Sequence, residues 1–126
     1  MKHILPLLLA GLAVGCSRPI PTEKYFAGQP VQHWLTAVTD PNPKVRKKAA
    51  DVLGNVGAAD PAVVPALIAA LKDADASVRD AAVLGLSKMG PTAAAAAPAL
   101  QEACTDPDAN VRGHAATALR RVRGAD

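Results

Sequence analysis

The sequence contains very few aromatic residues: one Trp, one Tyr and one Phe among 126 residues, although half of the residues are hydrophobic. Alanine accounts for 28 of the hydrophobic residues. A compact domain around one deep core normally contains more large side chains, so the composition argues against that architecture. Alanine is the strongest helix former. The composition therefore favours many shallow contacts between closely packed helices.

Cysteine and excess charge are also scarce. The two cysteines, Cys16 and Cys104, could form only one disulfide, which argues against a disulfide-stabilised scaffold. The net charge of +3 comes from 14 basic and 11 acidic residues. This excess is too small to indicate nucleic-acid binding, so we predict no nucleic-acid partner.

The N-terminal residues MKHILPLLLAGLAVGC have the pattern of an export signal. After Lys2, residues 4–14 are uncharged and would span about 16 Å as a helix, which is half of the ~30 Å hydrocarbon core of a bilayer. The stretch is too short for a good transmembrane anchor and suits the apolar region of a signal peptide. We therefore predict a signal peptide over residues 1–15.

Ala13-Val14-Gly15-Cys16 resembles the lipobox of bacterial lipoproteins, with Ala13 where leucine is usual. The resemblance implies that Cys16 is lipidated and becomes the new N-terminus. The protein would then be anchored in a membrane of the bacterial cell envelope and face the periplasm or the exterior. An ordinary secretory signal, or an uncleaved hydrophobic N-terminus, is the alternative. We expect residues 16–27, which contain Pro19 and Pro21, to form an extended, flexible tether.

The rest of the chain repeats itself at a spacing of 33 residues. Alanine and leucine recur in the same register downstream of each repeated segment. The repeated segments are 40–46 (DPNPKVR), 73–79 (DADASVR) and 106–112 (DPDANVR). This periodicity predicts a repeat domain over residues 28–124, made of units at about 28–57, 61–90 and 91–124.

Each unit is predicted to contain two helices. We expect the first helices at 30–39, 61–72 and 91–105, and the second helices at 43–56, 76–89 and 109–123. Pro65 and Pro98 should bend or delay the first helices, and Asp60 is expected to cap one of them. Gly57 and Gly90 stand where a C-terminal cap requires glycine. One helix pair cannot bury its apolar face alone, so we predict a short all-α solenoid of three stacked pairs.

The pattern Asp-x-Asx-x-x-Val-Arg-x-x-Ala resembles the HEAT-like repeat, specifically the PBS-lyase HEAT-like type. This resemblance implies right-handed superhelical stacking and a protein-binding surface. Some relatives are enzymes: deoxyhypusine hydroxylase binds iron through His-Glu dipeptides, but here Trp34 follows His33 and Ala115 follows His114. We therefore predict a non-enzymatic interaction or scaffold module with no cofactor and no metal. The alternative is an accessory subunit of a lyase or hydroxylase.

Three arginines recur at the start of the second helices and allow two interpretations. They form either a basic ladder for an anionic partner, or ion pairs with turn aspartates of the same or an adjacent unit. The family resemblance favours the second, structural interpretation. The residues of this ladder are Arg46, Arg79, Arg112, Asp40, Asp73 and Asp106.

Other polar residues of the second helices are candidates for contact with a protein partner. They are Lys47, Lys48, Asp51, Asp80 and Lys88. The basic run 44–48 is either a solvated helix face or a contact for anionic lipid headgroups, and Arg120, Arg121 and Arg123 are expected to form a polar cap. We expect Trp34 to pack in the core and Cys104 to be buried and unreactive. His33 and His114 have no carboxylate at ligand spacing in the sequence.

Overall fold

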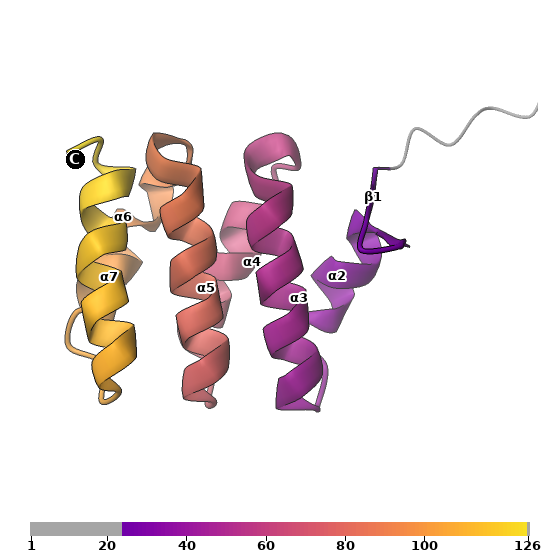
Figure 1. The fold of residues 1–126 in the computed structure, drawn as a ribbon, viewed down its shortest axis with the longest axis horizontal. Helices are drawn as coiled ribbons and strands as arrows, with labels where there is room; N and C mark the ends of the chain where they lie inside the picture. Colours follow the sequence, from indigo (N-terminus) through magenta and orange to yellow (C-terminus); the bar gives the residue numbers. More distant parts are fainter. Residues whose placement is uncertain (1–23, 126) are drawn as a thin grey trace, which may run out of the picture.

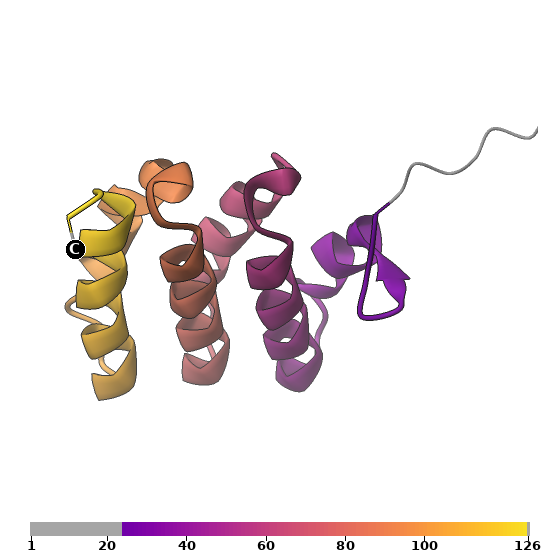
Figure 2. The ribbon, with the colours of Figure 1, turned by 45° about the horizontal axis from the view of Figure 1, so that its top comes forward.

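The chain folds into three helix pairs stacked side by side, as the computed structural model, which describes residues 24–125, shows (Figure 1). The first helices are α2 (Val31–Ala37), α4 (Val63–Ala70) and α6 (Ala97–Ala103), and the second helices are α3 (Pro43–Val56), α5 (Ala76–Met89) and α7 (Ala109–Val122). The second helices form one layer, and the first helices lie behind it in both views (Figures 1 and 2). The prediction of a short all-α solenoid is confirmed. The predicted signal peptide (1–15), Cys16 and residues 17–23 of the tether lie outside the described residues.

The third residue of each repeated turn is the N-cap of the second helix, which begins at the following residue. Asn42, Asp75 and Asp108 each accept a hydrogen bond from the backbone N–H two residues later, over 2.9, 2.8 and 2.9 Å. These caps bind N–H groups that have no partner within the helix. After each helix comes a glycine in the left-handed region, Gly57, Gly90 or Gly124, with φ of 64°, 58° and 74°. These signals explain why the predicted bounds of the second helices are correct to within one residue.

The first helices are shorter than predicted. Each of the last two follows a 3₁₀ segment, η1 (Gly57–Ala59) or η2 (Gly90–Ala96). Pro65 and Pro98 lie in the first turns of α4 and α6, where a missing N–H is tolerated, and so they delay both helices. The expected role of Asp60 is corrected: its carboxylate accepts the Ala62 N–H over 2.8 Å in the preceding turn, and α4 begins only at Val63.

A small hairpin precedes the first helix pair. β1 (Tyr25–Phe26) pairs antiparallel with β2 (Gln29–Pro30), and the two turn residues, Ala27 and Gly28, both have positive φ, 49° and 80°. Two central residues with positive φ are typical of a type I′ turn. The indole Nε1 of Trp34 donates to the Phe26 carbonyl over 2.8 Å and holds the hairpin against α2. The folded part therefore begins at Tyr25, and the expectation of an extended tether is wrong for residues 25–27.

The interior is a narrow strip of leucine, valine and alanine between the two helix layers. Leu53, Leu67, Leu86 and Leu100 are fully buried. Trp34 occupies the register position of Leu67 and Leu100 and is 7% exposed, so it packs in the core as expected. Because each unit buries its apolar side chains only against its neighbours, the exposed surface consists of two broad layers and two ends.

Glycine meets glycine where α3 and α5 pack together. A Cβ added to Gly54 would lie 2.8 Å from the Cα of Gly85, and one added to Gly85 would lie 3.0 Å from the Cα of Gly54. Real Cβ atoms do not approach so closely, so no larger residue fits either position without moving a helix. At the next junction the same register positions hold Ser87 and Ala118.

Candidate functional site

Arginine–aspartate pairs join successive units along the edge formed by the turns. Nε and Nη2 of Arg46 donate to the two carboxylate oxygens of Asp73 over 2.8 and 3.0 Å. Arg79 binds Asp106 in the same way, over 2.9 and 3.1 Å. In both pairs the aspartate lies 27 residues after the arginine, in the next unit. Of the two interpretations of the ladder, the geometry of Arg46 and Arg79 matches the structural one, with the partner in the adjacent unit.

The third nitrogen of each guanidinium is bound by the turn of its own unit. Nη1 of Arg46 donates to the carbonyl of Asp40 over 2.8 Å, and Nη1 of Arg79 donates to that of Asp73 over 2.7 Å. Arg112 makes the same contact with the carbonyl of Asp106, over 2.8 Å. The orientation of all three arginines is therefore fixed by backbone that belongs to their own unit.

The pair between Arg79 and Asp106 is largely removed from solvent, with 15% and 8% of the two side chains exposed. Burial by itself acts to raise the pKa of the Asp106 carboxyl. Hydrogen bonds from Arg79 and from the Asp108 N–H outweigh this effect, and the pKa of Asp106 falls below its ordinary value. The same balance lowers the pKa of Asp73. Both aspartates are therefore ionised at neutral pH and bind their arginines as carboxylates.

The ladder is incomplete at its two ends. Within residues 24–125 no carboxylate lies against Nε or Nη2 of Arg112, because these residues include no further turn beyond the third unit to supply one. At the other end the Asp40 carboxylate accepts the Asn42 N–H over 2.8 Å but receives no arginine among the described residues. These two residues of the predicted ladder therefore lack the contact between units that Arg46, Arg79, Asp73 and Asp106 make.

The two helix layers differ strongly in charge. Helices α3, α5 and α7 contain nine lysine and arginine residues against two aspartates. Helices α2, α4 and α6 contain one charged residue, Glu102. The charges of the whole sequence nearly balance, but the layer of second helices is basic, because most acidic side chains lie in the turns. An acidic ligand would be attracted to the layer of second helices.

Leu84 lies at the centre of this basic layer and is 40% exposed. It borders a shallow depression of about 210 Å³ that extends from Asp51 on α3 across α5 to Arg121 on α7. Lys88, which donates to the Asn55 side chain over 3.1 Å, also lines the depression. We call this area the front surface: Lys47, Asp51, Asp80, Leu84, Lys88 and Arg121.

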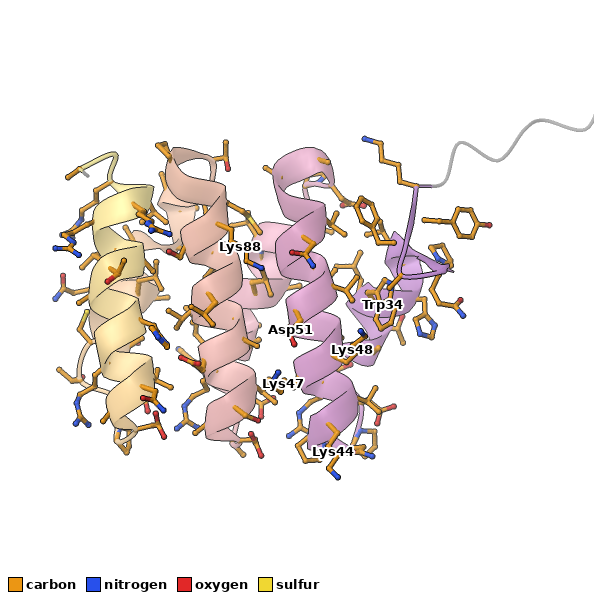
Figure 3. The ribbon with its side chains drawn as sticks, viewed as in Figure 1. Trp34, Lys44, Lys47, Lys48, Asp51 and Lys88 are labelled. Carbon is orange, nitrogen blue, oxygen red and sulfur yellow. The ribbon has the colours of Figure 1, made fainter. Side chains whose placement is uncertain are left out.

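Four of the five residues predicted for a partner surface lie on the front surface, and most of them contact side chains of this chain. The Nζ of Lys47 lies 3.0 Å from Oδ2 of Asp51, and Figure 3 shows both residues on the side of α3 that faces Lys88. Lys48 lies on the opposite side of α3, nearer to Trp34 (Figure 3). Sequence reasoning missed Leu84, although the polar residues at its register positions in the other units, Asp51 and Thr117, indicate an exposed position.

Two expectations about single residues are corrected. His114 does not stand alone, since its Nδ1 lies 2.7 Å from Oδ1 of Asp80 on the neighbouring helix. The partners are 34 residues apart, so no local pattern could reveal them. Cys104 is a free thiol that is only half-buried. Its register equivalents Val38 and Leu71 are buried beside the following unit, whereas no unit within residues 24–125 covers Cys104 from that side.

Residues 24–125 contain neither a metal-binding cluster nor a membrane-spanning helix. No group of three or more histidine, cysteine, aspartate and glutamate side chains is placed there to hold a metal ion. No helix in this part of the chain has the length and apolar character needed to cross a bilayer.

The arrangement of stacked helix pairs, joined by ladders and contacting only their neighbours, defines the molecule as an α-solenoid repeat protein. Comparison with known families agrees: residues 31–120 match the family described as HEAT repeats. The chain therefore belongs to the HEAT repeat family. No curated protein matches the sequence significantly. HEAT repeats generally mediate interactions between proteins, which is consistent with a scaffold role.

Proposed function

We propose that this chain is a non-enzymatic protein-binding module, anchored to the bacterial cell envelope as a lipoprotein through Cys16, and that its front surface binds an acidic segment of another protein. The exposure of Leu84 at the centre of the front surface is the observation that carries the proposal. A large apolar side chain surrounded by charged groups is typical of a binding site, because burying it against a partner removes apolar area from water.

Charge complementarity supports an acidic partner. The second helices contain a large excess of basic residues, and the two aspartates on them, Asp51 and Asp80, each contact a neighbouring Lys47 or His114. Lys88 and Arg121 border the depression beside Leu84. A segment with carboxylates on both sides of an apolar side chain would match this pattern in charge and in polarity.

Capture of a partner from detergent-solubilised envelope by the full chain tests the binding site. The variant Leu84→Ser should weaken capture of the identified protein about tenfold or more, because residues at the centre of interfaces contribute most to affinity. Lys88→Glu should weaken it as well. Tyr25→Ser is the matched control, since Tyr25 is also a large exposed side chain, at 60%, but belongs to the hairpin. Equal capture by wild type and Leu84→Ser would contradict the proposed site.

A separate experiment tests the anchor. Metabolic labelling with palmitate should label the wild-type protein and not Cys16→Ser, and globomycin should block its processing. Two acyl chains hold a small protein on a membrane durably, since each buried CH₂ contributes ~0.8 kcal/mol. Unlabelled wild-type protein would refute the lipoprotein proposal and leave the front surface untested by that result. A metal or pigment that co-purifies with the chain would contradict the non-enzymatic role.

A further inference from the structure

We infer that the C-terminal end of the stack is a second protein-binding surface, where carboxylates of a partner protein bind a row of arginines on α7 and at its C-cap. The row consists of Arg112, Arg120 and Arg123, with Ala116 between the first two. We call it the end surface. It goes beyond the proposed function, because it is separate from the front surface and recognises its ligand by a different contact.

The repeat register shows what the end surface corresponds to in the other units. On α3 and α5 the same positions face the following unit and are covered by it: Ala50 and Val83 are fully buried, and Gly54 and Ser87 are buried as well. On α7 the equivalent positions, Ala116 and Arg120, are exposed. The end surface is therefore the side by which each earlier unit binds its neighbour, left uncovered among the described residues.

Arg112 is oriented to receive a carboxylate. Its Nη1 donates to the carbonyls of Asp106 and Pro107 over 2.8 and 3.1 Å, as Nη1 of Arg79 does to its own turn. In Arg46 and Arg79 the same anchoring leaves Nε and Nη2 to bind both oxygens of an aspartate. Because Arg46 and Arg79 both bind an aspartate in this way, the ligand expected for Arg112 is also a carboxylate, bound through two parallel charge-assisted hydrogen bonds.

A second copy of this chain is a poor occupant of the end surface. Stacking it in the same register would set Arg120 against Val52, where the internal junction has Gly54 against Gly85. The glycine contact leaves no room for these side chains. Lys48 of the second copy would also bring positive charge toward the arginines of the end surface. The end surface therefore favours a different protein, one whose carboxylates reach the arginines without the close backbone approach of the internal junction.

The spacing of the arginines indicates the shape of the partner segment. Arg112 and Arg123 are eleven residues apart, which corresponds to about 16 Å along a helix. An acidic helix with carboxylates at positions i, i+8 and i+11 presents the matching row. Figure 1 shows α7 at the end of the stack away from the hairpin, so a bound segment would not meet β1 or β2.

The experiment uses a capped 16-residue alanine-based peptide with glutamates at these three positions, and a glutamine version as its control. Each is titrated into the ¹⁵N-labelled full chain in zwitterionic detergent, and the arginine Nε–H signals are followed by NMR. The glutamate peptide should shift the signals of Arg112, Arg120 and Arg123, whereas the glutamine peptide should not. Arg112→Lys and Arg120→Gln should each weaken binding about tenfold, the equivalent of one charge-assisted hydrogen bond.

Lys44→Gln is the control, because it removes one positive charge from the exposed start of α3, outside both the front surface and the end surface. It should bind the peptide like wild type. If Arg112→Lys unfolds, as seen by circular dichroism, Arg120→Gln and Arg123→Gln carry the test.

Three results would overturn the inference: no shift at these arginines, equal weakening by Lys44→Gln, or shifts caused by inorganic phosphate or phosphatidylglycerol vesicles and not by the glutamate peptide. Each of these leaves the outcome for Leu84→Ser unchanged, so the two surfaces are tested independently.

Discussion

Replacing Arg79 with alanine removes the side-chain pair that joins the second unit to the third. The variant loses two charge-assisted hydrogen bonds to Asp106 and leaves that carboxylate without its cation, with 8% of its side chain exposed. Truncating one partner costs about 0–1 kcal/mol for an exposed pair and about 3–5 kcal/mol for a fully buried one. This pair lies between the two limits, so we expect a loss of about 2 kcal/mol in the free energy of unfolding. For a domain of about 100 residues that loss lowers the melting temperature by about 10 °C.

Arg112→Ala is the matched control for this prediction. It removes the same side chain and the same hydrogen bond to a turn carbonyl, but no carboxylate pair. We expect it to cost less than about 1 kcal/mol. Thermal and urea unfolding, followed by circular dichroism, measure both variants, and a double-mutant cycle with Asp106→Ala isolates the coupling between the paired residues. Equal destabilisation by Arg79→Ala and Arg112→Ala, or a coupling energy near zero, would refute a stabilising role for the ladder.

Three further predictions concern pH, the glycine contact and the hairpin. The pKa of Asp106 is lowered in the folded protein, so its contribution to stability is present above its unfolded pKa of about 4 and is lost as the pH falls through the lower folded value. Urea unfolding between pH 5 and 2 should therefore show a smaller loss of unfolding free energy on acidification in Asp106→Asn than in wild type. Gly54→Ala should destabilise by about 1–3 kcal/mol, since the new Cβ would meet backbone at 2.8 Å. Gly113→Ala, with nothing within 4 Å, should stabilise by about 0.5–1 kcal/mol; thermal melts that rank the two alanine variants the other way would contradict the packing described. Trp34→Phe should cost about 1 kcal/mol and speed hydrogen exchange in the hairpin, because it removes the indole hydrogen bond to the Phe26 carbonyl; unchanged exchange would show that this bond does not hold the hairpin.

The second helices could be predicted from the sequence because each of their boundaries has a local cause. The caps at Asn42, Asp75 and Asp108, together with the following glycines, lie within a few residues of the helix ends that they determine. The hairpin escaped prediction, because alanine at position 27 is not one of the residues that usually adopt positive φ.

Contacts between units were harder to predict than the helices. The sequence suggested that the arginines pair with turn aspartates, but it left open which unit supplies the partner, and only the stacking of the helices decides this. The pair between His114 and Asp80 and the exposure of Leu84 and Cys104 depend on the same stacking. These features lie at or near the surfaces that the proposals use, so the candidate sites were less predictable than the fold.

The short loop that each arginine–aspartate pair closes has a consequence for synthesis on the ribosome. Because Asp73 follows Arg46 by only 27 residues, the first pair can form once the turn that contains Asp73 has emerged, while the turn that contains Asp106 is still inside the ribosome. The second pair becomes possible once another 33 residues of the chain have emerged. Such a chain can fold in the order of its translation, because the aspartate of each new turn binds the arginine of the unit already folded.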